Sequence, residues 1–164
     1  MAGARALPWR IVHAAAWRLR VIETIAALAF ARALIRFIPF ARWRRLLGPL
    51  GVAGREEAVA VPLDESQQRL VRAVRREIMR WAPRLPFEAV CLPQAMAARW
   101  VLGRRGVDGR ITIGARTGSE AQRPVDLHAW LMVGDFCVTG DTERRTYEAF
   151  VRRASVPAGS AARQ

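Results

Sequence analysis

The chain of 164 residues is strongly basic: 27 arginines face 14 acidic residues, the net charge is +13, and 52% of the residues are apolar. This length and apolar content predict one domain around one core. The arginines are scattered, without a glycine–arginine tract, zinc-finger spacing or aromatic RNA-binding motif, so nucleic acid is not an expected partner. Most of them are interpreted as a solvated surface, although arginine also suits acidic proteins and anionic lipids.

The two cysteines, Cys91 and Cys137, are separated by 45 residues. Two cysteines at this spacing predict neither a metal site nor a disulfide framework, and no cofactor is expected. Thiols of this kind fit a reducing compartment.

The longest apolar run, residues 21–40, is interrupted by Glu23, Arg32 and Arg36. Charges at these positions argue against a membrane-spanning helix. Arginines just before the run also argue against a secretory signal. The protein is therefore predicted to be cytoplasmic, and association with a membrane surface is an alternative that we do not favour.

Residues 1–60 are predicted to form a helical N-terminal segment followed by a linker. Apolar residues recur with a helical period from Trp9 to Phe37, and Pro39 ends this helix. The stretch Phe40–Leu47 is predicted to form a short second helix.

The same segment contains ten arginines, three acidic residues and more large apolar side chains than one core-facing helix needs. An apolar surplus edged with arginine is typical of a docking face. Packing on the core is the first interpretation of this segment, a membrane interface is an alternative, and our hypothesis is that part of it forms a docking region for a partner. The apolar residues concerned are Trp9, Trp17, Phe30, Phe37, Phe40 and Trp43.

Residues 61–153 are predicted to form the main core, and residues 154–164 a disordered tail. Asp64, with Gln67 three residues later, has the spacing of a capping box at a helix start. The helix that follows is amphipathic and is stopped by Pro83. Its apolar stripe consists of Leu70, Val71, Val74 and Ile78.

After a further helix that begins at Cys91, the periodicity changes from helical to alternating. Gly134 and Asp135 join the last two apolar runs, and a two-residue turn that begins with glycine is a strong hairpin signal. Helices followed by antiparallel strands predict an α+β fold, in which the Cys91 helix packs on the sheet. The predicted strands are Arg110–Thr117, Leu127–Val133 and Phe136–Thr139.

Cys91 is the candidate nucleophile. Pro93 is tolerated in the first turn of a helix, so the Cys91 sulfur is expected beside the unpaired N–H groups and the positive end of the helix dipole. That environment lowers the pKa of a thiol and favours the thiolate, although a buried structural cysteine is the alternative. The Cys91 N–H is the oxyanion donor that we predict. Gln94 suits either an oxyanion contact or a capping box and is left out of the site.

The predicted hairpin brings a histidine and an aspartate together. If Val133 faces Phe136, His128 lies directly opposite Asp141, with both side chains on one face. Asp141 would then hold the tautomer of His128, which would take the proton from Cys91. A bulge at Gly140 would break this register.

Each of these residues also has a structural interpretation. His128 could be a half-buried strand histidine, and Asp141 could cap the end of a strand. Asp126 and Asp135 are rival carboxylates. Cys137 pairs with Met132 in this register, about four residues along the strand from His128, and is interpreted as a packing residue.

A nucleophilic cysteine at a helix start, followed by a hairpin with histidine and then aspartate, resembles the transglutaminase-like cysteine peptidase core. More specifically, CLPQAMAARWVLGRRGV, then RITIGAR, then HAWLMV and a glycine–aspartate pair after the next strand are similar to the lasso peptide leader peptidases. The resemblance covers about Val21–Phe150 and implies a transglutaminase/papain-like core. It places Cys91, His128 and Asp141 at the family's three catalytic positions. Met132 stands where the family often has glutamate.

The resemblance implies a cysteine protease that removes the leader from a ribosomally synthesised lasso peptide precursor through a thioester. A separate ATP-dependent cyclase then closes the released core. No winged-helix-like leader-binding domain is predicted in residues 1–60, which implies a separate leader-binding protein. Our hypothesis is that the docking region in residues 1–60 receives this protein or the precursor. The alternatives are an acyl or amide transferase with the same triad and a non-catalytic basic adaptor that binds the leader or nucleic acid.

Overall fold

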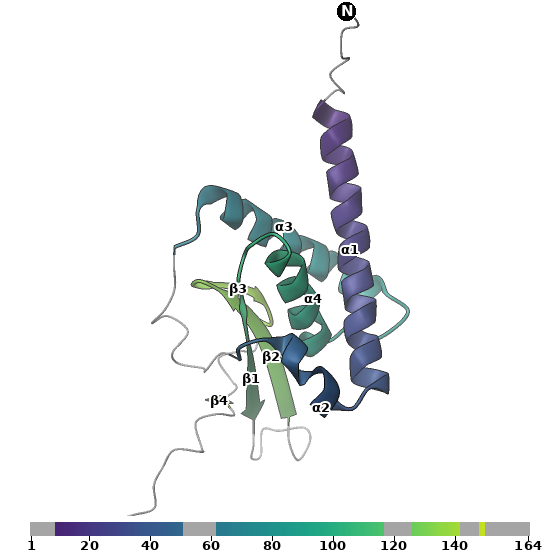
Figure 1. The fold of residues 1–164 in the computed structure, drawn as a ribbon, viewed down its shortest axis with the longest axis vertical. Helices are drawn as coiled ribbons and strands as arrows, with labels where there is room; N and C mark the ends of the chain where they lie inside the picture. Colours follow the sequence, from purple (N-terminus) through teal and green to yellow (C-terminus); the bar gives the residue numbers. More distant parts are fainter. Residues whose placement is uncertain (1–8, 51–61, 117–125, 142–147, 150–164) are drawn as a thin grey trace, which may run out of the picture.

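The computed structural model describes residues 9–50, 62–116, 126–141 and 148–149. Helices and an antiparallel sheet form separate parts of the chain, in agreement with the predicted α+β class (Figure 1). The α-helices are α1 (Trp9–Phe37), α2 (Phe40–Trp43), α3 (Glu65–Trp81) and α4 (Cys91–Gly103), and the 3-10 helices are η1 (Arg44–Leu47) and η3 (Ala82–Arg84). The strands are β1 (Arg110–Arg116), β2 (Asp126–Val133), β3 (Phe136–Thr139) and β4 (Glu148–Ala149). The predicted tail at 154–164 lies outside the described residues.

The sheet has the strand order β3-β2-β1-β4, and all neighbouring strands are antiparallel. The predicted hairpin of β2 and β3 is confirmed, with Val133 paired to Phe136 across the turn. Gly134 in this turn has a φ of 58°, and none of the described non-glycine residues has a positive φ. A positive φ at the first turn position only is the pattern of a type II′ turn, which requires glycine there.

The register of this hairpin shifts by one residue along β3. Met132 pairs with Cys137, but Leu131 pairs with Thr139, so Val138 is an extra residue on β3. The prediction that His128 lies directly opposite Asp141 is therefore wrong. If the observed register continued, Asp141 would lie opposite the residue that follows His128 on β2. A bulge of this kind leaves no trace in the alternation of apolar residues, which is the pattern from which the register was predicted.

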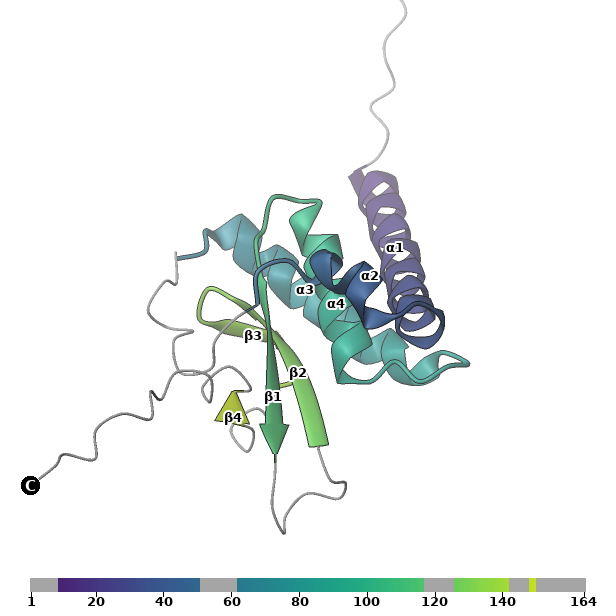
Figure 2. The same ribbon diagram turned by 60° about the horizontal axis from the view of Figure 1, so that its bottom comes forward.

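Helix α4 is the central element of the fold. It lies between α1 on one side and the sheet on the other, with α3 beside it (Figures 1 and 2). A helix that is covered on several sides needs apolar residues all round, and small ones let its neighbours approach closely. Ala95, Ala97 and Ala98 are fully buried in this position. The core around them includes Leu28, Val71, Val74, Ile78, Met96, Leu102, Ile111 and Leu131.

Helix α3 begins with the predicted capping box. The Asp64 carboxylate accepts a hydrogen bond of 2.8 Å from the Gln67 N–H, and the Gln67 side chain accepts one of 3.1 Å from the Asp64 N–H. Three residues of the predicted stripe, Val71, Val74 and Ile78, are buried. The apolar stripe therefore fixes α3 against the core, and Arg72 and Arg76 between its members are exposed.

Helix α1 and the two short helices that follow it have the predicted bounds, but one of the six apolar residues assigned to the docking face is not on the surface. Trp43 is buried, at 5% exposure, and donates its indole N–H to the Ile38 carbonyl, so it belongs to the core and not to an outer face. A groove of about 630 Å³ runs between α1 and the C-terminal end of α4. The docking role stays a prediction, and the Trp9 side chain lies outside the described residues. Of the apolar residues assigned to the docking face, the exposed ones are Trp17, Phe30, Phe37 and Phe40.

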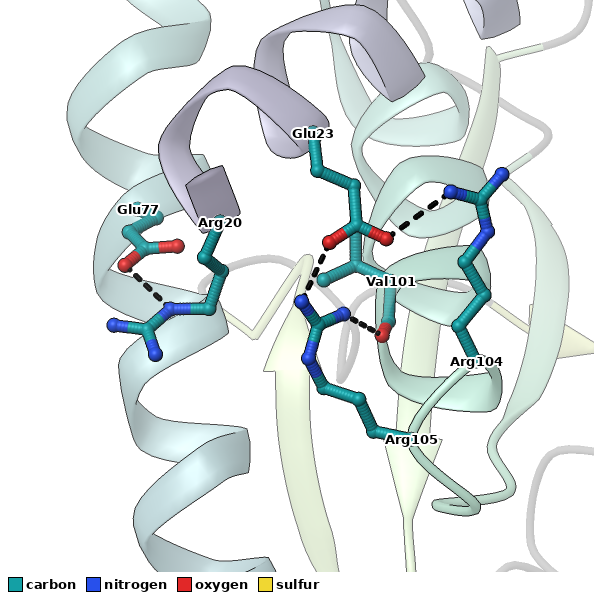
Figure 3. A network of polar contacts seen from close by, with 6 residues as sticks. All are labelled: Arg20, Glu23, Glu77, Val101, Arg104 and Arg105. Carbon is teal, nitrogen blue, oxygen red and sulfur yellow. Dashed lines mark hydrogen bonds and ion pairs between the residues drawn. The ribbon is translucent and has the colours of Figure 1, made fainter. Parts of the chain in front are cut away.

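Helix α1 is the longest helix of the described chain, and two of its charged residues, Arg20 and Glu23, contact neighbouring elements. Within the described residues, no helix is long and apolar enough to cross a membrane. Glu23 accepts hydrogen bonds of 2.6 Å from Arg105 and 3.2 Å from Arg104, which joins α1 to the end of α4 (Figure 3). Burial alone raises the pKa of Glu23, but the hydrogen bonds and charges of these two arginines outweigh it and leave the pKa below its ordinary value.

A second ion pair joins α1 to α3. Arg20 Nε lies 2.7 Å from Glu77 Oε1, and the Glu77 side chain is only 7% exposed (Figure 3). Removing one partner of a buried pair leaves the other charge in a poorly solvated site. Helix α1 therefore carries charges that bind it to α3 and α4.

We expect Arg20→Ala to destabilise the fold by about 2–3 kcal/mol, because Glu77 would remain buried without its cation. Arg69→Ala is the matched control on α3, since its pair with Glu65 is exposed on both sides and should contribute less than about 1 kcal/mol. Urea unfolding of the three proteins measures both values. Equal losses from the two substitutions would contradict the prediction.

Candidate active site

Cys91 is the first residue of α4, as predicted. Val90, in an extended conformation, is the N-cap, and no side chain caps this helix. Gln94 donates its side-chain N–H to the Ala89 carbonyl at 2.6 Å, so the capping-box role considered for it is wrong. The N–H groups of the first turn consequently have no side-chain cap and lie beside the Cys91 sulfur.

The thiol of Cys91 contacts the start of β2. Its sulfur is hydrogen-bonded to the side chain of His128, and the backbone N–H groups of Ala129 and Leu92 also bond to it. Burial on its own raises the pKa of the Cys91 thiol. The hydrogen bonds, together with the charge of His128, outweigh burial and bring the pKa below its ordinary value. The site therefore favours the thiolate.

The backbone of Gly140 determines the tautomer of His128. Its carbonyl oxygen lies 3.0 Å from His128 Nε2, and a carbonyl can only accept a hydrogen bond. Nε2 must therefore carry the proton, and the neutral imidazole has its lone pair on Nδ1. Nδ1 is then the atom that can receive the proton of Cys91. The ring of Trp130 is stacked on the imidazole, with 5.9 Å between centroids, and restricts its plane.

Asp141 follows Gly140 directly and is about half exposed. Its Oδ2 atom lies 3.8 Å from Arg75 Nη2, on α3. The structure thus brings Cys91 and His128 into contact and places Asp141 next to the carbonyl that meets the imidazole. The orienting role of Asp141 stays a prediction.

Gly140 and Arg75 were not predicted as members of the site. Gly140 has a φ of 77°, and a Cβ there would lie 3.0 Å from His128 Nε2. The sequence signal was the glycine at the end of a predicted strand, which marks a close approach or a bend. Arg75 gave no such signal, because an arginine between the apolar positions of an amphipathic helix is read as a solvated residue.

The rival residues lie elsewhere or outside the described part. Asp135 is exposed in the turn at the far end of β2 from His128. The side chain of Asp126 lies outside the described residues. Cys137 is buried with Trp130 and Met132 in a small cluster, as its packing interpretation required. Among the described residues, no group of three or more histidine, cysteine, aspartate or glutamate side chains is placed to hold a metal ion.

We expect iodoacetamide to alkylate Cys91 at a lower pH than an ordinary thiol. His128→Gln should move the pH dependence upward, because it removes a hydrogen bond and a charge that stabilise the thiolate. Mass spectrometry of the Cys91 peptide over a pH series gives the profile, and the buried Cys137 should react only after unfolding. An identical profile in the variant would exclude the contact with His128 as the cause of the lowered pKa.

We expect Gly140→Ala to slow this alkylation and to destabilise the protein by about 2–3 kcal/mol. A Cβ at position 140 would lie 2.7 Å from the Ala129 carbonyl oxygen as well as 3.0 Å from His128 Nε2. Gly106→Ala is the matched control, because Gly106 has a similar φ of 72° with nothing within 4 Å and should lose only about 1 kcal/mol from backbone strain. Similar effects of the two substitutions on alkylation would contradict the close approach at Gly140.

A comparison with known families agrees with this arrangement. The model of the transglutaminase-like superfamily matches residues 34–152, which is more than half of the chain and includes Cys91, His128 and Asp141. Searches of curated proteins and of solved structures found no match to this chain. The chain therefore belongs to the transglutaminase-like superfamily.

Proposed function

We propose that this protein is a cysteine peptidase that removes the leader from a ribosomally synthesised lasso peptide precursor. The observation that carries the proposal is the hydrogen bond between the Cys91 thiol and His128, at the uncapped start of α4, which lowers the pKa of the thiol. The superfamily includes both cysteine proteases and acyl transferases. The narrower assignment rests on the CLPQA segment that begins at Cys91 and the HAW segment that begins at His128.

In the proposed reaction, His128 Nδ1 takes the proton of Cys91, and the sulfur attacks the carbonyl carbon of the peptide bond after the leader. The C=O π electrons move to the oxygen, which becomes an oxyanion. The Cys91 backbone N–H, in the first turn of α4, is the donor that we propose for this oxyanion. The positive end of the helix dipole favours the same charge.

Collapse of this intermediate breaks the C–N bond and leaves the leader attached to Cys91 as a thioester. The imidazolium of His128 gives its Nδ1 proton to the departing amine of the core peptide. His128 then takes a proton from water, the resulting hydroxide attacks the thioester, and the sulfur leaves as thiolate. The released leader ends in a carboxyl group, which loses its proton to solvent, and the proton on His128 balances the thiolate.

We propose that Asp141 stabilises the imidazolium that forms in both steps. Its carboxylate lies next in the chain to the carbonyl that binds Nε2, and it carries the charge that a carbonyl lacks. In this arrangement, the Gly140 carbonyl sets the tautomer of His128, and the Asp141 carboxylate sets the electrostatic potential at its imidazole.

The proposed reaction brings partners and a location with it. The substrate is the leader region of the precursor, a separate leader-binding protein presents it, and an ATP-dependent cyclase uses the released core. We place the reaction in the cytoplasm. Both cysteines are present as thiols, which suits a reducing compartment.

Cys91→Ala should abolish leader cleavage and leave the fold intact, because the nucleophilic sulfur is lost from a helix start that has no side-chain cap. Cys137→Ala is the matched control and should keep the activity, with a loss of about 1–3 kcal/mol from the cavity in its small cluster. The assay follows a leader-bearing precursor by mass spectrometry, with and without the separate leader-binding protein.

Three other results would overturn the proposal. Full cleavage by Cys91→Ala would exclude the thioester. A leader joined to an added amine in place of water would identify a transferase. Precursor binding without any cleavage by the wild-type protein, in the presence of the leader-binding protein, would identify a non-catalytic adaptor.

A further inference from the structure

Arg75 extends from α3 to the end of β3 and contacts it at several points. Its Nη1 atom donates to the carbonyl of Cys137 at 2.6 Å and lies 3.3 Å from that of Val138. Its Nη2 atom lies 3.8 Å from the Asp141 carboxylate. The guanidinium carbon also lies 5.9 Å from the centre of the Phe136 ring, within the range of a cation–π contact.

These contacts lie where the β2–β3 ladder is irregular. Val138 is the extra residue of the bulge, and a bulge disrupts the regular hydrogen bonds of a ladder locally. Backbone carbonyls near a core need donors, and the planar guanidinium offers several in a fixed geometry. Arg75 therefore supplies donors at the point where the strand departs from regular pairing.

The same guanidinium holds the chain on both sides of Gly140. On one side it binds the carbonyls of Cys137 and Val138, and on the other it faces the carboxylate of Asp141. The Gly140 carbonyl between them meets His128 Nε2. We propose that Arg75 is a positioning residue, which sets the Gly140 carbonyl and the Asp141 carboxylate against His128 and so keeps the Cys91–His128 pair reactive.

The helix that carries Arg75 has a position fixed by the core. Val74 precedes Arg75, and Val71 and Ile78 lie about one turn away on either side, all three fully or almost fully buried. The Arg75 side chain itself is about one third exposed. Shortening it should therefore release the end of β3 and leave the α3 packing in place. The proposal rests on the proposed function for its meaning in catalysis, but its test needs no peptide substrate.

The test measures alkylation of Cys91 by iodoacetamide over a pH series in the full-length protein, together with the melting temperature. Arg75→Gln should slow alkylation at neutral pH about tenfold and move the profile upward, because a displaced His128 no longer stabilises the thiolate. Arg75→Lys keeps the charge but cannot bridge two carbonyls and a carboxylate, so we expect a loss of about threefold. Arg76→Gln, the exposed neighbour on α3, is the matched control and should leave the profile unchanged.

A double-mutant cycle tests whether Arg75 acts through the 140–141 segment. If it does, Arg75→Gln combined with Asp141→Asn should alkylate no more slowly than the slower single variant. If the two single-variant losses in alkylation rate multiply in the double variant, Arg75 and Asp141 act independently, and the proposal that Arg75 acts through the 140–141 segment is overturned.

Two further outcomes would overturn the proposal. In the first, Arg75→Gln melts at a lower temperature than the wild type but has the same alkylation profile, which would make Arg75 a stabilising residue only. In the second, Arg75→Gln fails to fold and Arg75→Lys retains the wild-type profile.

The alkylation test also separates this proposal from the proposed function. If the wild-type protein cleaves no leader but the Arg75 variants still slow alkylation, the peptidase assignment fails and the positioning role stands. If the wild-type protein cleaves the leader and the Arg75 variants alkylate normally, only the positioning role fails.

Discussion

The burial of α4 on two opposite sides is the constraint on which the rest of the structure depends. Its alanines let α1 and the sheet approach the same helix, so its N-terminal end has one position relative to β2. That end carries Cys91, and β2 carries His128. A thiol and an imidazole about forty residues apart in the chain therefore meet because the two elements that carry them pack against each other. Packing of apolar surface thus determines the electrostatics of the thiol.

Most of the fold could be predicted from the sequence, because it follows local patterns. The proline and capping signals at Pro39, Asp64 and Pro83 marked helix boundaries correctly, and the glycine of the turn identified the hairpin. The burial of Trp43 could not be predicted in this way. A tryptophan in an arginine-rich segment is expected on an outer surface. Only the tertiary structure shows that this part of the chain packs its tryptophan into the core.

The site could be predicted only in part. Cys91 at a helix start is a local feature, and its contact with His128 follows from the order of the elements. The register beyond Leu131 depends on the bulge at Val138, where Arg75 contacts the strand, and neither feature has a signal in the local sequence pattern. Counting residues outward from the turn therefore gives the wrong partner for Asp141, the residue that was expected to orient His128. The role of Gly140 was missed for another reason, since its contribution comes from the backbone.

The bond from His128 to the Gly140 carbonyl has a consequence for how this site can change during evolution. A carbonyl is not titrated in water at any pH at which the protein is folded, so the imidazole keeps its orientation whether or not nearby carboxylates are ionised. Every amino acid provides such an oxygen, but few accept the left-handed backbone that aims this one. Selection at position 140 would therefore act on the shape of the main chain, whereas position 141 could exchange its side chain without loss of the tautomer.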